Sequence, residues 1–120
     1  MTMTPEFVKD NGVYAALSGG EPFASYALTG SGDVLELEHL CVLPGWIGSG
    51  VGCWLFEHAM REAALRGARA VGIEADPNAE GFYLRMGARR VGENVYEIEG
   101  QKRTLPLLSV ELSRPAEGDS

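Results

Sequence analysis

Three glycines alternate within five residues at the point where a predicted strand gives way to a predicted helix. The segment reads Gly48-Ser49-Gly50-Val51-Gly52 and follows a strand predicted over Val34–Leu43, which Pro44 ends. Glycine in a first helical turn lowers helix stability by roughly 0.5–1 kcal/mol per residue relative to alanine. Three glycines are therefore a costly choice if the segment serves only as a turn. Glycine lets a backbone approach a ligand closely, and a helix start offers unpaired N–H groups and a positive dipole end. The segment therefore predicts a pyrophosphate site.

Other phosphate-binding motifs fit this segment less well. No Lys-Ser or Lys-Thr follows the glycines, which disfavours a nucleoside-triphosphate P-loop. A dinucleotide-binding fold is disfavoured because the glycine spacing differs and too little chain follows. The alternative left open is that the glycines only permit a tight turn between strand and helix.

The rest of the chain alternates between predicted strands and helices. Short strands are expected over Val13–Leu17 and Phe23–Leu28, and a helix is expected from the glycines to about Arg66. The apolar stripe of that helix comprises Gly52, Leu55, Phe56, Ala59, Met60 and Ala63. Later elements are a strand over Ala70–Ala75, a helix from about Ala79 to Met86 capped by Asp76-Pro77-Asn78, strands over Arg89–Gly92 and Leu105–Leu112, and a polar connection from Glu93 to Arg103. This order predicts a mixed α/β sheet with parallel strands around the first helix.

Size and charge limit the classes of partner. A chain of 120 residues with 45% apolar content predicts a single domain over residues 1–120, with a core of about residues 12–112 and flexible ends. The net charge of −7 argues against nucleic acid as a partner. No apolar run approaches the roughly 20 residues of a membrane span, and no signal peptide is present, so we expect a cytoplasmic protein without a membrane partner.

Cysteine and histidine are too few for a metal site. Cys41 and Cys53 have no metal-ligand spacing, and His39 and His58 do not complete one, so no metal is expected. Both cysteines are interpreted as small buried apolar residues.

The glycine segment and a second stretch together resemble the coenzyme A motifs of the GNAT superfamily of N-acetyltransferases. In that family a strand ending in Val-x-Pro leads to Arg/Gln-x-x-Gly-x-Gly/Ala, which here corresponds to Val42-Leu43-Pro44 followed by Ile47 to Gly52. The stretch from Asp76 to Ala88 resembles the family's Asn…Phe-Tyr-x-x-x-Gly-Phe pattern, about 30 residues further along. The resemblance covers about residues 12 to 112. It implies a GNAT-like mixed central sheet with a β-α-β-α-β core.

The resemblance also implies a co-substrate, a reaction and a set of binding residues. Acetyl-CoA would donate an acetyl group directly to a primary amine. The residues implied to hold the coenzyme are Leu40, Cys41 and Val42 at the pantetheine arm, Ile47, Gly48, Ser49, Gly50, Val51 and Gly52 at the pyrophosphate, and Asn78 at the coenzyme arm. The alternative function is a non-catalytic acyl-CoA-binding or oligomeric module derived from this fold.

Acetyl transfer to an amine needs a base for the amine proton and an acid for the departing thiolate. Tyr83 matches the family tyrosine that serves as the general acid, although packing in the core is the alternative. Glu38 and then Glu74 are the preferred bases, while Glu36 shares a strand face with Glu38, and a water chain could replace any of them. His39 is expected to point away from Glu38 as a core or edge residue. His58 is expected to be solvated on the outer helix face.

Two departures from the family pattern bear on these expectations. Ile47 replaces the usual Arg or Gln, which removes a side-chain donor and predicts weaker coenzyme binding. The usual first strand and first two helices are also expected to be absent, because only about a dozen residues precede Val13. Those helices normally form one wall of the acceptor site. The uncovered apolar sheet predicts a homodimer.

Overall fold

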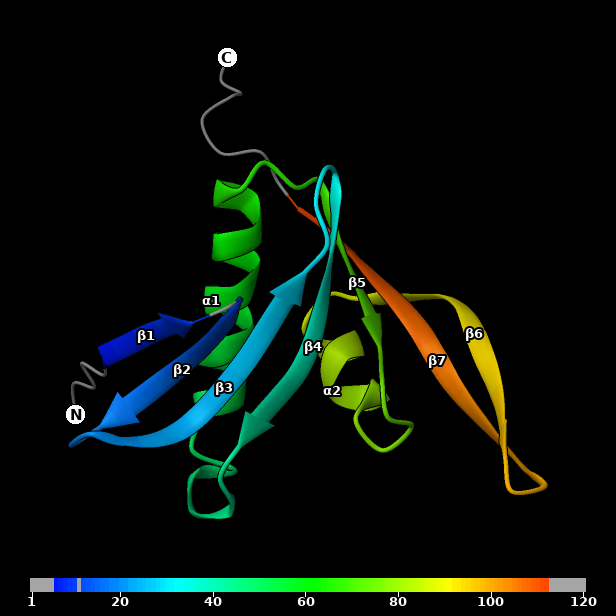
Figure 1. The fold of residues 1–120 in the computed structure, drawn as a ribbon, viewed down its shortest axis with the longest axis horizontal. Coiled ribbons are helices and arrows are strands. Elements are labelled where there is room, and N and C mark those ends of the chain that lie inside the picture. The colour runs from blue at the N-terminus through cyan, green and yellow to red at the C-terminus, as the bar shows by residue number, and fades with distance from the viewer. Residues whose placement is uncertain (1–5, 11, 113–120) are drawn as a thin grey trace.

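The computed structural model describes residues 6–10 and 12–112, which form a mixed sheet of seven strands in the order β1-β2-β3-β4-β5-β7-β6 (Figure 1). Strands β4 and β5 are parallel, and all other neighbouring strands are antiparallel. The elements are β1 (Glu6–Asp10), β2 (Val13–Ser18), β3 (Glu21–Thr29), β4 (Val34–Val42), the 3-10 helix η1 (Pro44–Trp46), α1 (Val51–Leu65), β5 (Ala70–Glu74), α2 (Glu80–Arg85), β6 (Arg89–Ile98) and β7 (Gln101–Glu111). The predicted mixed α/β sheet is thus confirmed.

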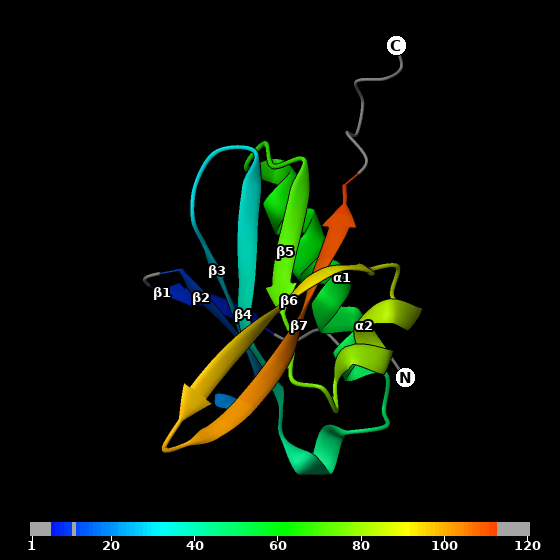
Figure 2. The ribbon, with the colours of Figure 1, turned by 90° about the vertical axis from the view of Figure 1, so that its right-hand side faces the viewer.

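Both helices lie on the same side of the sheet, as Figure 2 shows. Helix α1 buries its predicted apolar stripe against the sheet, with Leu55, Phe56, Ala59 and Ala63 each no more than 2% exposed. Tyr26 and Val71 meet this stripe from β3 and β5 and are fully buried. The opposite face of the sheet carries no helix among the described residues. No described helix is long and apolar enough to cross a membrane.

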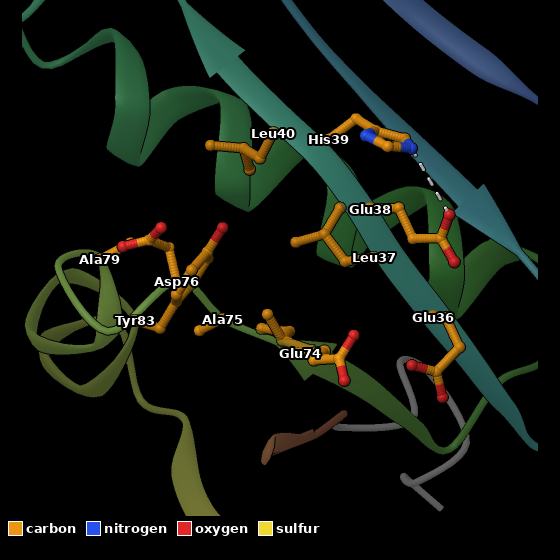
Figure 3. A pocket seen from close by; sticks show the side chains of 11 residues that line it. Glu36, Leu37, Glu38, His39, Leu40, Glu74, Ala75, Asp76, Ala79 and Tyr83 are labelled. Atoms are coloured by element: carbon orange, nitrogen blue, oxygen red, sulfur yellow. Dashed lines mark ion pairs between the residues drawn. The ribbon is translucent and has the colours of Figure 1, made fainter. Parts of the chain in front are cut away.

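Strands β4 and β5 pair over only part of their length. The paired residues are Val34 to Leu37 with Ala70 to Ile73. Just beyond this stretch β4 contains a bulge, because Ala27 of β3 pairs with Glu38 and Ser25 pairs with Cys41. His39 lies in the bulge with a left-handed backbone, φ 57°. Beyond the bulge β4 and β5 diverge, which opens the sheet near its centre (Figure 3).

Two strand regions differ from the predicted pattern. Strand β1 was not predicted, and it forms a hairpin with β2. The stretch from Glu93 to Arg103 was interpreted as a polar connection, but it extends β6 and β7 into a long hairpin. The hairpin turn is formed by Glu99 and Gly100, which have φ values of 52° and 81° and therefore fit a two-residue turn. The prediction failed because nearly every residue here is exposed, so no apolar alternation marks the strands.

Three further expectations about side chains are wrong. Cys41 and Cys53 are exposed rather than buried. His58 is half-buried, because Phe7 of the unpredicted β1 stacks on its ring at a centroid distance of 3.8 Å. Asp76 accepts a hydrogen bond from the Asn78 backbone N–H at 2.8 Å and so forms a turn, while Ala79 is the residue that begins α2 without a side-chain cap. The ends expected to be flexible, residues 1–5 and 114–120, lie outside the described residues.

Candidate functional site

A cavity of about 470 Å³ opens where β4 and β5 separate. It is lined by residues 36–40 of β4, by the end of β5 and the turn after it, and by Ala79 and Tyr83 at α2. Figure 3 shows Glu36 and Glu38 projecting from β4 and Glu74 from β5, with Asp76 and Tyr83 across the gap. The three predicted catalytic residues, Glu38, Glu74 and Tyr83, therefore line one cavity.

Two glutamates of β4 are positioned by their neighbours on the same sheet face. A Cβ at Gly72 would lie only 2.8 Å from Oε2 of Glu36, so this glycine leaves the room that the Glu36 carboxylate occupies. Glu38 accepts a hydrogen bond from the Thr29 hydroxyl at 3.2 Å. Its Oε1 lies 3.7 Å from Nε2 of His39. His39 was expected to point away from Glu38, but the bulge breaks the strand alternation and leaves its ring exposed beside that carboxylate.

Glu74 is held by the β6–β7 hairpin. Its Oε2 accepts hydrogen bonds from the Tyr96 hydroxyl and from Nδ2 of Asn94, the latter at 2.8 Å. These two donors, Tyr96 first and Asn94 second, lower the pKa of the Glu74 carboxyl. A carboxylate stabilised in its charged form is a weaker base than a free one. The hairpin residues were not predicted as part of the site, because that stretch was interpreted as a connection.

Tyr83 is 8% exposed and lies between the core and the cavity. It packs against Phe56 and Phe82, with ring centroids 6.0 and 5.2 Å away. Figure 3 shows its hydroxyl directed toward the gap between the strands. Burial, and secondarily the neighbouring Cys41, raises the pKa of this hydroxyl. Tyr83 therefore keeps its proton at neutral pH, as a proton donor must.

A second cavity, of about 420 Å³, lies at the glycine segment and shares Leu40 with the first. Gly48 and Gly50 have φ values of 87° and 89°, and a Cβ on either would meet no atom within 4 Å. The backbone therefore presents open space that a ligand could fill. The first helical bond joins Trp54 N–H to the Gly50 carbonyl at 3.1 Å. The N–H groups of residues 51–53 precede it and so have no partner within the helix.

The residues that line this second cavity fit a pyrophosphate group, which such N–H groups and the helix dipole attract. Its lining includes six of the ten predicted coenzyme residues: Leu40, Val42, Ile47, Gly48, Gly50 and Gly52. Four others line neither cavity: Cys41, Ser49, Val51 and Asn78. Ser49 instead donates to the Trp46 carbonyl, and Val51 is buried in the core. Beyond Leu37, β4 has no β5 partner, so its main chain has no strand beside it on that side among the described residues.

Three lining residues of the second cavity were not predicted: Cys53, Phe82 and Arg85. Phe82 brings α2 against the start of α1, since a Cβ on Gly52 would lie 3.5 Å from its ring. The Phe-Tyr motif marked this helix but did not indicate which of its other side chains face the glycines. Among the described residues, no three His, Cys, Asp or Glu side chains are arranged to hold a metal ion.

The sequence matches a family model described as "Acetyltransferase (GNAT) domain" over residues 2–102. No curated protein sequence matches the chain. Among solved structures, a GCN5-related N-acetyltransferase from Rhodopseudomonas palustris is similar, with 26% identity and a TM-score of 0.70. That match covers 83% of this chain and 61% of the other, so this chain spans less than two thirds of that protein's length.

Two further structures share the fold at lower identity. A GNAT family acetyltransferase from Elizabethkingia anophelis, solved with acetyl-CoA bound, has 17% identity and a TM-score of 0.71 over 83% of this chain and 75% of its own. The ribosomal-protein-S18-alanine N-acetyltransferase from Escherichia coli has 19% identity and a TM-score of 0.72 over 92% of this chain and 76% of its own. At these identities the likeness shows the fold alone.

Proposed function

The chain belongs to the GNAT acetyltransferase family, and we propose that it transfers an acetyl group from acetyl-CoA to a primary amine. The observation that carries this proposal is the single cavity lined by Glu38, Glu74 and Tyr83. That cavity adjoins the glycine cavity through Leu40, so a coenzyme held at the glycines would reach it along the free side of β4. The acetyl-CoA bound to the fold relative from Elizabethkingia anophelis adds support.

In the proposed reaction, Glu38 takes a proton from the ammonium group of the acceptor, because a protonated amine has no lone pair. The neutral nitrogen attacks the thioester carbonyl carbon, and the carbon–sulfur bond then breaks. Tyr83 gives its hydroxyl proton to the departing thiolate. The second proton, which the nitrogen loses on becoming an amide, passes to solvent, and the tyrosinate regains its proton from solvent. Glu38 is favoured over Glu74 as the base, since two hydrogen bonds already hold the Glu74 carboxylate in its charged form. Glu74 and Glu36 then attract the cationic acceptor.

The test combines coenzyme binding with turnover. We expect acetyl-CoA to bind in calorimetric titration, and Tyr83→Phe to keep this binding while acetyl transfer falls by about 10²–10⁴-fold, the usual contribution of a proton-transfer group. Binding without transfer to any amine in a broad panel would instead favour a non-catalytic coenzyme-binding module. No binding by the folded protein would reject the proposal.

Gly50→Val tests whether acetyl-CoA binds at the glycine cavity. A branched side chain is strained at φ 89°, so the variant should disturb the loop and lose acetyl-CoA. Gly32→Val is the matched control, because Gly32 has φ 86°, equally open surroundings and no part in either cavity. The control should bind acetyl-CoA as the parent does.

The proposal includes a homodimer. Its support is the sheet face without helices, where Val13 and Val34 are 45% and 51% exposed. Light scattering at micromolar concentration should give twice the 12.9 kDa chain mass, and a monomeric mass would reject this part of the proposal.

A further inference from the structure

We propose that Arg85 binds the pyrophosphate of acetyl-CoA and so supplies the side-chain cation that Ile47 does not. This inference rests on the proposed coenzyme site but concerns a residue outside the glycine motif. Ile47 lines the glycine cavity with an apolar side chain that is 69% exposed. The loop itself therefore offers backbone donors and a helix dipole but no side-chain charge.

Arg85 reaches the cavity from a different element, helix α2. Helix α2 lies against the start of α1, where a Cβ on Gly52 would sit 3.5 Å from Cε1 of Phe82. Arg85 follows Phe82 by three residues and therefore lies on the same helix face. Both side chains line the cavity together with Gly48, Gly50 and Gly52. Side chains on a helix lean toward its N-terminus, and Nη1 of Arg85 accordingly lies 3.5 Å from the Cβ position of Gly81.

The charges around the two cavities support this assignment. The lining of the glycine cavity contains no carboxylate, and Arg85 is its one charged residue among those described. The neighbouring cavity is lined by four carboxylates: Glu36, Glu38, Glu74 and Asp76. In a chain of net charge −7, a doubly charged pyrophosphate needs a local cation to offset long-range repulsion.

The chemistry of the guanidinium suits the task. Arginine presents paired donors that match two phosphate oxygens, remains charged at every working pH and is easier to dehydrate than an ammonium group. The other arginines at the end of α2 and the start of β6 are occupied, since Arg89 pairs with Glu111, and Arg90 pairs with Glu80 and Glu93. Arg85 is exposed, so replacing it removes no buried contact.

The test is calorimetric titration of coenzyme A into the parent and into Arg85→Gln. We expect the dissociation constant to rise about ten-fold or more, as for loss of a charge-assisted hydrogen bond. Arg85→Lys should recover part of this loss. Arg61→Gln is the matched control, because it changes the net charge equally from an exposed site on α1 that lines neither cavity.

Two further arms identify the group that Arg85 contacts. Dephospho-coenzyme A lacks the 3′-phosphate but keeps the pyrophosphate, so Arg85→Gln should weaken its binding by the same factor. A loss seen only with full coenzyme A would overturn the pyrophosphate assignment. Ile47→Arg added to Arg85→Gln should restore binding, because residue 47 also lines the cavity and the change returns a cation to it.

The remaining outcomes separate this inference from the proposed function. If the parent binds coenzyme A and Arg85→Gln binds it equally well, the inference fails while the proposed function stands. If the folded parent does not bind coenzyme A, both fail. A thermal melt of each variant shows whether a loss of binding reflects unfolding.

Discussion

His58 is held by aromatic neighbours on the helix side of the sheet. Its ring stacks on Phe7, and its Nδ1 lies 2.7 Å from the Tyr26 hydroxyl. Burial lowers the pKa of His58, while the nearby Glu62 opposes that effect and Arg61 adds to it. Burial also raises the pKa of the Tyr26 hydroxyl, which keeps its proton and can donate it to the histidine. His58 is thus a neutral, half-buried side chain beside the core.

This position predicts a pH-dependent stability. The folded protein binds a proton at His58 less readily than the unfolded chain, whose histidine has a pKa near 6.5. The unfolded state therefore takes up more protons as the pH falls below about 6.5, and the free energy of unfolding decreases there. Urea unfolding between about pH 7.5 and 5 should show this slope.

His58→Gln removes the titrating group but keeps a polar side chain near Tyr26. Its stability should be lower at neutral pH, and its dependence on pH below 6.5 should be smaller than in the parent. Carboxylates remote from residue 58 contribute alike to both proteins, so their effect cancels in the comparison. Equal slopes would show that His58 does not couple protonation to folding.

Residues whose role depends on distant partners were the hardest to predict. Gly48, Gly50 and Tyr83 lie in local motifs, and each lines a cavity, while their predicted roles stay predictions. His58 was misjudged because Phe7 comes from a strand with no clear pattern, and burial of a helix face depends on what covers it. His39 was misjudged because a bulge changes side-chain direction without a sequence signal.

At the scale of elements, the β6–β7 hairpin acts as a support for the cavity. Its two strands extend from Arg89 to Glu111 around the turn at Glu99 and Gly100. It delivers Asn94 and Tyr96 to the Glu74 carboxylate at the end of β5. Glu74 is otherwise exposed, so the hairpin fixes where its charge lies.

Removing one hydroxyl from the hairpin should change the titration of Glu74. Tyr96→Phe deletes the largest cause of the lowered pKa, so the pKa of Glu74 should move up toward its ordinary value. Asn94→Ala deletes the second cause and should move the pKa in the same direction by less. Carboxyl chemical shifts in an NMR titration measure both changes. An unchanged pKa in Tyr96→Phe would mean that the hairpin does not hold this carboxylate in solution.

Elements with a strong periodic pattern were predicted within a few residues. The strand ending near Val42 and the helix ending near Arg66 follow from apolar alternation and from the stripe ending at Ala63. The hairpin could not be found in this way, because its residues are exposed on both faces and Glu-Gly is a weaker turn signal than Asn-Gly. The cavity itself follows from pairing between distant strands, which no local pattern encodes.

At the scale of the whole molecule, the two adjoining cavities carry opposite charges. Four carboxylates line the one between β4 and β5, and Arg85 is the charged residue of the one at the glycines. The negative coenzyme and the positive amine of the proposed reaction would thus be drawn to different sides of Leu40, which lines both cavities. This separation of charge would allow one small chain of net charge −7 to attract the two proposed substrates, whose charges are opposite in sign.

The acidic cavity predicts a preference among acceptors of equal length. For 1,4-diaminobutane, n-butylamine and 4-aminobutanoate, kcat/KM should fall in that order, because the far end is positive, neutral and then negative. Each step should be about ten-fold, as for one charge interaction in a partly enclosed site. Raising the salt concentration should reduce the differences.

Glu36→Gln serves as the matched variant for this series. It keeps the shape of the side chain that fills the space above Gly72 and removes one negative charge. The advantage of the diamine over n-butylamine should shrink in this variant, while coenzyme A binds as in the parent. Equal kcat/KM values for all three acceptors would reject charge as the basis of acceptor choice.

The partial pairing of β4 with β5 has a mechanical consequence. Four residue pairs, from Val34 to Leu37 with Ala70 to Ile73, join two groups of strands in the sheet, β1 to β4 and β5 to β7. Beyond these pairs the two groups of strands diverge, while α1 packs against strands of both groups. A ligand lying along the free edge of β4 would bridge the two groups of strands beyond their paired residues and so fix the distance between them.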